Sequence, residues 1–408
     1  MKKLMTSIAA AAVLSTASFA SPSLAVDGTG DFLIAPAYFA QGAFETELKV
    51  INTNLTDSIL VRVVVRDGYI SEELDFTILL SPGDVWVGSL YEEGGEAKIK
   101  SSDDSTYKAA LANGVSLQKP YGMTRTSVLE NSTKGNFKQG YVEFYPLAQY
   151  PEGMTGKVQK SVLEGRFEAL QTGVTTFDNA TDGVAGKAIV DVDNNSLAGF
   201  VTVKRNDSVK FAMTLPMSAI EGASDNFLNG AFINNANDTD PANYLVDTSA
   251  APVDGDANYV NEMWTLLQKS SVAIPFDNSG TNSNLLMTFW NDLQYADATP
   301  EVEVRQYNVT VRDLEENSVQ SEFIPISPRP PVQANTVQNE LGVKEVSSLV
   351  SESNSNFTEG WVQLTNVLNQ HNGQLGQAAT ASFIPTMMKA VYVDDTVATS
   401  WIYLPFGQ

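Results

Sequence analysis

Several stretches of the chain recur later in it, in the same order. Segments 65–82 and 311–328 align without a gap and share Val-Arg-Asp and a closing Ser-Pro. Segments 127–144 and 347–364 share Ser, Leu, Asn-Phe, Gly and Val, and the shared Phe137 and Phe357 are expected to be buried. Ordered recurrence predicts an internal duplication, and coincidence among similar β-strands is the alternative. Two weaker pairs precede these: 31–39 with 270–278, and 45–54 with 283–292.

The recurring segments alternate between apolar and other residues with a period of two. Val61, Val63 and Val65 alternate with Arg62 and Val64, and a similar alternation runs through 301–311. This pattern predicts strands with one buried face. The phase slips at 305–306, where two polar residues adjoin, and a β-bulge would explain the slip.

Polar turn residues separate these runs. Asn52-Thr53-Asn54 and Pro82-Gly83-Asp84 are turn signals, and short strands with such turns predict an antiparallel β-sandwich. The order ETELKVINTN, ILVRVVVRDG and LDFTILLSPGDVWVGSL resembles the immunoglobulin-like sandwiches common in secreted bacterial proteins. The resemblance covers roughly 31–91 and 270–332 and implies architecture alone, because a shared fold does not imply a shared function.

The expected fold is therefore mostly β, as an internally duplicated pair of immunoglobulin-like antiparallel sandwich units. The first half spans 26–230, with insertions near 91–114 and 151–195, and the second spans 231–408. A few short helices are expected as well, and their apolar faces predict core packing. The candidates are 158–171 and 261–269.

The first residues have the features of a secretory signal peptide. Lys2 and Lys3 precede a short apolar run at 8–14, and Ser23-Leu24-Ala25 has the small-x-small form of a cleavage site. A membrane anchor is the alternative, but the run is too short for a hydrocarbon core of roughly 30 Å. The expected mature chain begins at Val26, has no transmembrane segment, and is secreted to the surface or periplasm of a bacterium.

Composition narrows the possible partners and chemistry. The chain has 25 basic and 48 acidic residues, a net charge of −23, so the phosphate backbone of a nucleic acid would be repelled. It has no cysteine, which excludes disulfides, thiolate catalysis and Cys-ligated metals. Its one histidine, His371, lies in a polar segment with Gly and is expected in an exposed loop.

Two Asp-rich segments are weak candidates for Ca²⁺ sites, because alternate oxygen ligands on a tight loop suit this ion. Both read D-x-D-x-N, but neither has the glycine or the final glutamate of an EF-hand loop, and Asp and Asn also favour plain turns. Apart from this ion, no cofactor is expected. The candidate ligands are Asp191, Asp193 and Asn195 in one segment and Asp254, Asp256 and Asn258 in the other.

No nucleophile elbow or phosphate-binding loop occurs in the sequence. The expectation is therefore a non-enzymatic protein that assembles on the cell envelope in the manner of a surface layer, through contacts with itself or with envelope components. A soluble ligand-binding or adhesion module is the first alternative. A glycoside hydrolase using two carboxylates is the second, and paired acids are unspecific in a chain this acidic.

Overall fold

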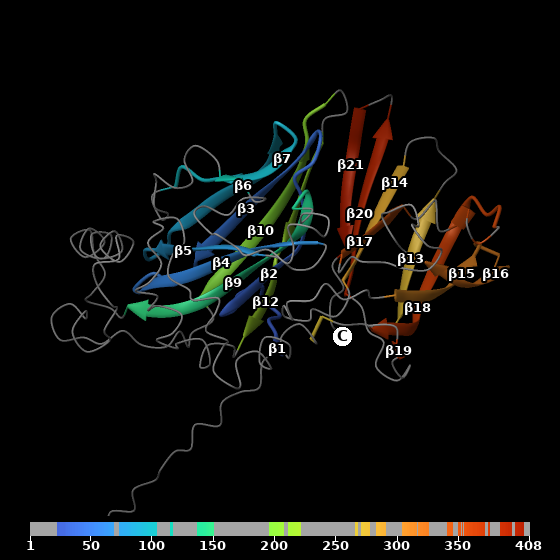
Figure 1. Cartoon of the computed structure of the whole chain (residues 1–408), viewed down its shortest axis with the longest axis horizontal. Coiled ribbons are helices and arrows are strands. Elements are labelled where there is room, and N and C mark those ends of the chain that lie inside the picture. The colour runs from blue at the N-terminus through green and yellow to red at the C-terminus, as the bar shows by residue number, and fades with distance from the viewer. Residues whose placement is uncertain are drawn as a thin grey trace, which may run out of the picture.

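The structure is a computed structural model of the chain. It describes residues 23–68, 73–103, 115–116, 137–150, 196–207, 211–221, 266–267, 271–277, 283–290, 304–315, 317–325, 341–345, 350–351, 353, 355–371, 374–375, 384–393 and 396–403. All named elements among these residues are β-strands, and they form four antiparallel sheets (Figure 1). The mostly β, antiparallel part of the expected fold is confirmed.

Two six-stranded sheets use strands from the first part of the chain. Sheet 1 has the order β1 (Ser23–Leu24), β12 (Ser218–Glu221), β2 (Phe32–Phe39), β9 (Gln139–Tyr150), β4 (Ser58–Asp67) and β5 (Glu73–Leu80). Sheet 2 has the order β11 (Phe211–Pro216), β10 (Leu197–Arg205), β3 (Phe44–Asn52), β6 (Val85–Glu93), β7 (Glu96–Lys100) and β8 (Val115–Ser116).

The other two sheets use strands from the later part of the chain. Sheet 3 has the order β13 (Ser271–Asp277), β18 (Glu359–His371), β15 (Val304–Arg312) and β16 (Ser318–Pro325), and β19 (Gln374–Leu375) also pairs with β18. Sheet 4 has the order β17 (Leu341–Glu345), β14 (Ser283–Trp290), β20 (Ile384–Val393) and β21 (Thr396–Tyr403).

The strand orders of the two parts correspond. The order β2-β9-β4-β5 in sheet 1 matches β13-β18-β15-β16 in sheet 3, and the order β11-β10-β3-β6 in sheet 2 matches β21-β20-β14-β17 in sheet 4. Each matched set also keeps its order along the chain. Among the described strands, β7 (Glu96–Lys100) has no counterpart in sheet 4, and it lies in the segment 91–114 where an insertion is expected.

Sheets 1 and 2 pack face to face around one apolar core. Val61, Val63 and Val65 of β4 are fully buried in this core, as predicted. Arg62 and Val64 on the other side of β4 are buried as well, so the expectation of a single buried face is wrong for this strand. Trp86 of β6 is also fully buried, and its ring contacts that of Phe144 of β9 in the facing sheet, with the ring centroids 6.4 Å apart. This core is the layered packing expected of a β-sandwich.

The predicted turn at Asn52 holds the sandwich together at one end. The fully buried Asn52 amide donates hydrogen bonds to the carbonyls of Asp57 (2.8 Å) and Ser81 (3.1 Å), and its oxygen accepts one from the amide of Asn54 (3.0 Å). A buried amide needs such partners, because leaving it without them costs free energy. One side chain therefore links the end of β3 to the loops that flank β4 and β5.

The central strand pairs of sheets 1 and 3 also agree in register. Arg66 of β4 lies opposite Tyr141 of β9, and Arg312 of β15 lies opposite Trp361 of β18. The next pairs are valine with valine in both sheets.

Each of these strand pairs contains a bulge at the same distance from the arginine. The register shifts after Leu60, six residues before Arg66, and after Gln306, six residues before Arg312. The irregularity predicted at 305–306 thus occurs beside Gln306, but the extra residue is Val367 of the partner strand β18 and not a residue of β15.

Two glycines explain why segments 127–144 and 347–364 share a Gly near the start of a strand. A Cβ at Gly140 would collide with the carbonyl oxygen of Arg66, and a Cβ at Gly360 would collide with that of Arg312. Gly360 also has a φ of 148°, which side chains rarely adopt. Phe137, before the first glycine, is 1% exposed, whereas Phe357, before the second, is only half-buried, so its predicted burial is wrong.

Several other expectations fall mostly outside the described residues. Segment 158–171 is entirely outside them, and of 261–269 only Leu266 and Leu267 are described, in a turn. Strand β1 lies within the predicted signal peptide and pairs with β12. Cleavage after Ala25 would leave β12 at that edge of sheet 1.

We predict that Gly140→Ala and Gly360→Ala each lower the free energy of unfolding by about 1–3 kcal/mol, because the added methyl group must displace a backbone carbonyl in a paired strand. Denaturant unfolding of each variant measures this effect. Gly94→Asn is the control, since Gly94 has a φ of 66°, which Asn tolerates, and open space around it. Alanine variants as stable as the parent protein would show that the strands do not approach this closely.

Candidate functional site

The outer face of sheet 2 carries a regular array of charged side chains. Along β3 every second residue points away from the core, and the same alternation holds in β6, β7 and β10. Lysines and glutamates occur on this face in equal number. They are Lys49, Lys98, Lys100 and Lys204, with Glu45, Glu47, Glu93 and Glu96.

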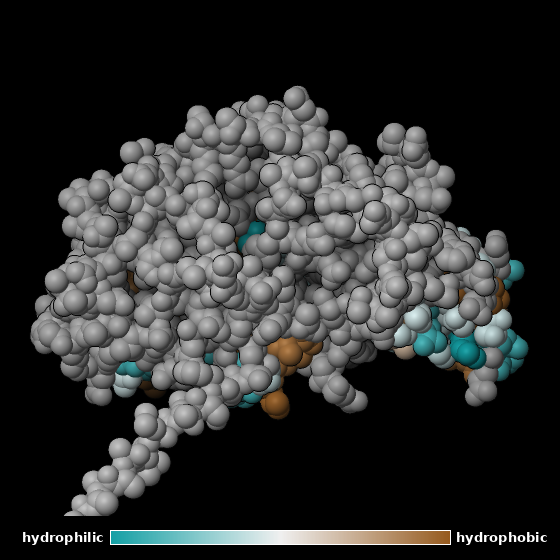
Figure 2. All heavy atoms as spheres, turned by 60° about the horizontal axis from the view of Figure 1, so that its bottom comes forward, coloured by the Kyte–Doolittle hydropathy of each residue, from teal (hydrophilic) through white to brown (hydrophobic). Residues whose placement is uncertain are grey.

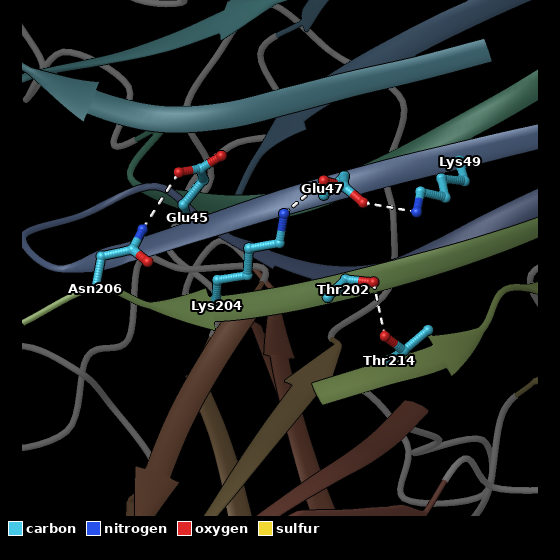
Figure 3. Close-up of polar contacts among 7 residues, drawn as sticks. All are labelled: Glu45, Glu47, Lys49, Thr202, Lys204, Asn206 and Thr214. Carbon is cyan, nitrogen blue, oxygen red and sulfur yellow. Dashed lines mark hydrogen bonds and ion pairs between the residues drawn. The ribbon is translucent and has the colours of Figure 1, made fainter. Parts of the chain in front are cut away.

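Glu47 is the centre of this array (Figure 3). Its Oε2 accepts a hydrogen bond from Nζ of Lys204 on the neighbouring strand at 2.5 Å, and its Oε1 lies 2.9 Å from Nζ of Lys49. On either side, Asn206 donates to Glu45 at 3.3 Å, and the hydroxyls of Thr202 and Thr214 are 2.8 Å apart. The network therefore crosses β3, β10 and β11.

The lysines change the acidity of Glu47. The hydrogen bond from Lys204 is the main cause that lowers the pKa of the Glu47 carboxyl, with a smaller contribution from Lys49 that is partly opposed by burial. On the same face the Lys98 ammonium lies 2.7 Å from Glu93, and it lowers the pKa of that carboxyl. These carboxylates are thus charged and paired at neutral pH.

This balance contrasts with the chain as a whole, where acidic residues outnumber basic ones by 48 to 25. Net charge of one sign makes two copies of a protein repel each other, whereas a locally neutral face does not. Apolar side chains lie beside the charges, since Phe200 of β10 is 38% exposed and Val85 of β6 is 39% exposed. The outer face of sheet 2 is therefore the described surface of sheets 1 and 2 best suited to contact another protein.

The outer face of sheet 1 has a different character, because it is buried. Arg66 Nε donates a hydrogen bond of 2.6 Å to Oε2 of Glu143, and the side chains are 6% and 0% exposed. The hydroxyl of Tyr145 donates to the same oxygen at 2.8 Å. Phe32 and Ile34 of β2, on this face, are fully buried as well.

The corresponding positions of sheet 3 have neither this ion pair nor this burial. By register, Gln363 stands where Glu143 stands in sheet 1, and Thr365 stands where Tyr145 stands. Gln363 donates a hydrogen bond of 3.2 Å to the Ser271 hydroxyl, and the Arg312 guanidinium lies over the Trp361 ring, 5.3 Å from its centroid. All five of these side chains are half-buried.

The calcium candidates Asp191, Asp193, Asn195, Asp254, Asp256 and Asn258 lie outside the described residues. Within the described ranges, no group of three or more His, Asp or Glu residues is arranged to hold a metal ion. His371, expected in a loop, is the last residue of β18 and lies opposite Gln374.

The charged faces were not predicted as sites. The alternation of Glu45, Glu47 and Lys49 in β3 is readable in the sequence, but their pairing with Lys204 depends on a contact between distant strands. The same holds for Arg66 and Glu143, which lie on neighbouring strands far apart in the chain.

Comparison with known protein families, with curated proteins and with solved structures found no match. Among the residues described, no helix is long and apolar enough to cross a membrane.

We predict that Glu47→Gln destabilises the protein at neutral pH by about 1 kcal/mol or less. Because the pKa of Glu47 is lower in the folded chain, its charge contributes stability above the pKa of the unfolded chain, and this contribution disappears as pH falls through the folded pKa. The stability difference between parent and variant should therefore shrink from pH 7 to pH 3. Denaturant unfolding at several pH values measures it. Glu45→Gln is the control, because Glu45 accepts a hydrogen bond from a neutral amide and not from a lysine. A stability difference between parent and Glu47→Gln that is the same at pH 3 as at pH 7 would contradict the pairing of Glu47 with the lysines.

We also predict that Arg66→Met destabilises the protein by about 3–5 kcal/mol, because it leaves the buried Glu143 carboxylate without its cation. Arg66→Met combined with Glu143→Leu should recover much of this loss, since neither member of this buried ion pair then remains. Thermal and denaturant unfolding of the two variants test this. A double variant less stable than Arg66→Met would show that the ion pair itself stabilises the sandwich.

Proposed function

We propose that the chain is a secreted, non-enzymatic protein of the bacterial cell envelope that assembles with further copies of itself, and that it is built from two duplicated immunoglobulin-like sandwich units. The outer face of sheet 2 carries this proposal. It is the broad, locally neutral face of an otherwise acidic chain, and such a face allows neighbouring molecules to approach.

The matched strand orders and bulges support the duplication, because two unrelated sandwiches have no reason to share a register irregularity. The immunoglobulin-like assignment rests on four strands. In chain order β3, β4, β6 and β9 pair as β3 with β6 in sheet 2 and as β4 with β9 in sheet 1. Strands B, C, E and F of an immunoglobulin domain pair in this way. Strand β2 departs from that pattern, since it lies beside β9 instead of β3.

Assembly of an acidic chain needs either a neutral contact surface or cations between copies. Divalent ions would act at Asp254 and Asp256, or at Asp191 and Asp193, if these residues converge with other oxygens. An ion that binds only the assembled state stabilises it by mass action. Calcium is therefore part of the proposal, and the neutral face of sheet 2 acts with or without it.

The test has a cellular arm and a solution arm. We expect electron microscopy with antibody labelling to show the protein on the native cell surface. For the purified chain, we expect light scattering to detect larger assemblies in millimolar Ca²⁺ than in NaCl of matched ionic strength. Asp254→Ala with Asp256→Ala should reduce that difference.

Charge reversal on the outer face of sheet 2 tests the surface itself. Lys204→Glu places a second carboxylate beside Glu47, so it should reduce assembly while the melting temperature shows that the chain still folds. Lys204→Gln serves as the milder variant if the reversal prevents folding, and Lys138→Glu, in the turn before β9, is the control of equal charge change. A monomer in all these conditions, absent from the cell surface, would contradict assembly and favour the binding-module alternative.

A further inference from the structure

The outer face of sheet 3 is accessible where the matching face of sheet 1 is covered. In sheet 1, Tyr141 is 1% exposed and Glu143 is 0% exposed. In sheet 3 the matching Trp361 and Gln363 are half-buried, and Ala273 of the adjacent strand is exposed. The same face of the same strand arrangement is thus a packing surface in one sheet and remains partly open in the other.

Among the residues that the structure describes, Arg312 on this open face has no anionic partner. Its Nε is buried without a hydrogen bond, and its guanidinium contacts the ring of Trp361. The matching Arg66 donates from the same atom to Glu143. Because a guanidinium stays charged and a buried donor without a partner costs free energy, the Arg312 position favours binding of a carboxylate.

Glu359 on the neighbouring strand β18 is an anion on the same face. It begins β18 two residues before Trp361, the spacing of residues on one face of a strand, and it lies opposite Asp277 of β13. It is half-buried and has no hydrogen-bond or ion-pair partner among the residues that the structure describes. The face therefore carries a cation, Arg312, and an anion, Glu359, and neither has a partner of opposite charge in the part of the chain that the structure describes.

Such a pair is self-complementary. When two identical faces meet about a two-fold axis, residue i of one copy contacts residue j of the other and the reverse contact forms as well. The exposed Pro275 and Ala273 of β13 and the half-buried Trp361 would supply apolar area between the charges. Figure 2 shows that the described surface at the end of the molecule where β15 and β16 lie is mixed, with mostly hydrophilic residues and small apolar patches.

We propose that the outer face of sheet 3 is an interface between two copies of this chain, in which the Arg312 guanidinium of each copy binds the Glu359 carboxylate of the other. The proposal deepens the proposed assembly, since it rests on the same occupant, a second copy. It differs in the surface, because the contact uses sheet 3 and an ion pair across the interface instead of the neutral face of sheet 2.

Charge reversal with rescue tests the interface in the full-length secreted chain. We expect sedimentation velocity over a range of concentrations to show a dimer. Arg312→Glu and Glu359→Arg should each weaken dimerisation about tenfold or more, because like charges then face each other across the contact. The double variant, with the charges exchanged, should restore the dimer to within about threefold of the parent.

The control is Lys138→Glu. Lys138 lies in the turn before β9, outside sheets 2 and 3, with its ammonium 3.5 Å from Oε2 of Glu92. It undergoes the same charge change, so the dimer of this variant should match the parent. Arg312→Gln checks folding. It removes a buried donor that has no partner, and it should therefore weaken the dimer while melting at the parent temperature.

A parent chain that stays monomeric, single variants that dimerise like the parent, or a double variant that does not recover would each overturn this proposal. Its failure is distinguishable from failure of the proposed function. A protein found in assemblies on the cell surface that are unaffected by Arg312→Glu but lost with Lys204→Glu would keep the proposed function and remove the sheet 3 interface.

Discussion

The close contact of β9 with β4, and of β18 with β15, is the constraint on which the two central sheets depend. In each pair a glycine lies against the carbonyl oxygen of an arginine, so no side chain fits at that point. This contact aligns the valines that follow, which then point into the core, and it places the residue after each glycine, Tyr141 or Trp361, beside the arginine. A shift of one residue would turn every core valine toward the outer face.

From this shared framework the two sheets diverge on their outer faces. In sheet 1 the arginine is matched by Glu143 and Tyr145, so its charge is neutralised inside a buried surface. In sheet 3, Gln363 cannot neutralise Arg312, and the guanidinium instead lies over the larger aromatic ring of Trp361. A guanidinium over an aromatic face tolerates partial exposure to water better than a lone buried charge does. The buried outer face of sheet 1 and the partly open one of sheet 3 thus differ in the residues at matching positions.

The repeats in the sequence predicted much of this framework. The match of 65–82 with 311–328 placed β4 and β15 in equivalent positions, and near the phase slip at Gln306 the register of β15 shifts against β18. Alternation predicted which side of β4 faces the core, but the other side of β4 is buried as well, although only one buried face was expected. These features depend on residues that are close together in the chain, so they appear as periodic patterns in the sequence. Phe357 was misjudged because similarity to Phe137 says nothing of the neighbours that cover a ring.

The polar contacts could not be predicted in the same way, because they join strands that are distant in the chain. Glu47 and Lys204 meet only because β3 and β10 are neighbours in sheet 2, and one strand alone does not reveal its neighbour. Alternation does reveal that charged residues share a face, as Glu45, Glu47 and Lys49 do. What it leaves open is whether each charge finds a partner within the molecule.

Whether surface charges are paired within the molecule affects how copies of an acidic chain can associate. Where lysines and glutamates pair within one face, as around Glu47, the field near the surface is weak and a second molecule meets little repulsion. Where a cation and an anion lie on one face but not in contact, as with Arg312 and Glu359, each retains its capacity for a partner of opposite charge. The first kind of surface permits contact without specifying its geometry, whereas the second specifies orientation, because both ion pairs form only about a two-fold axis. A chain that carries both can join copies in a defined orientation despite a net charge of −23.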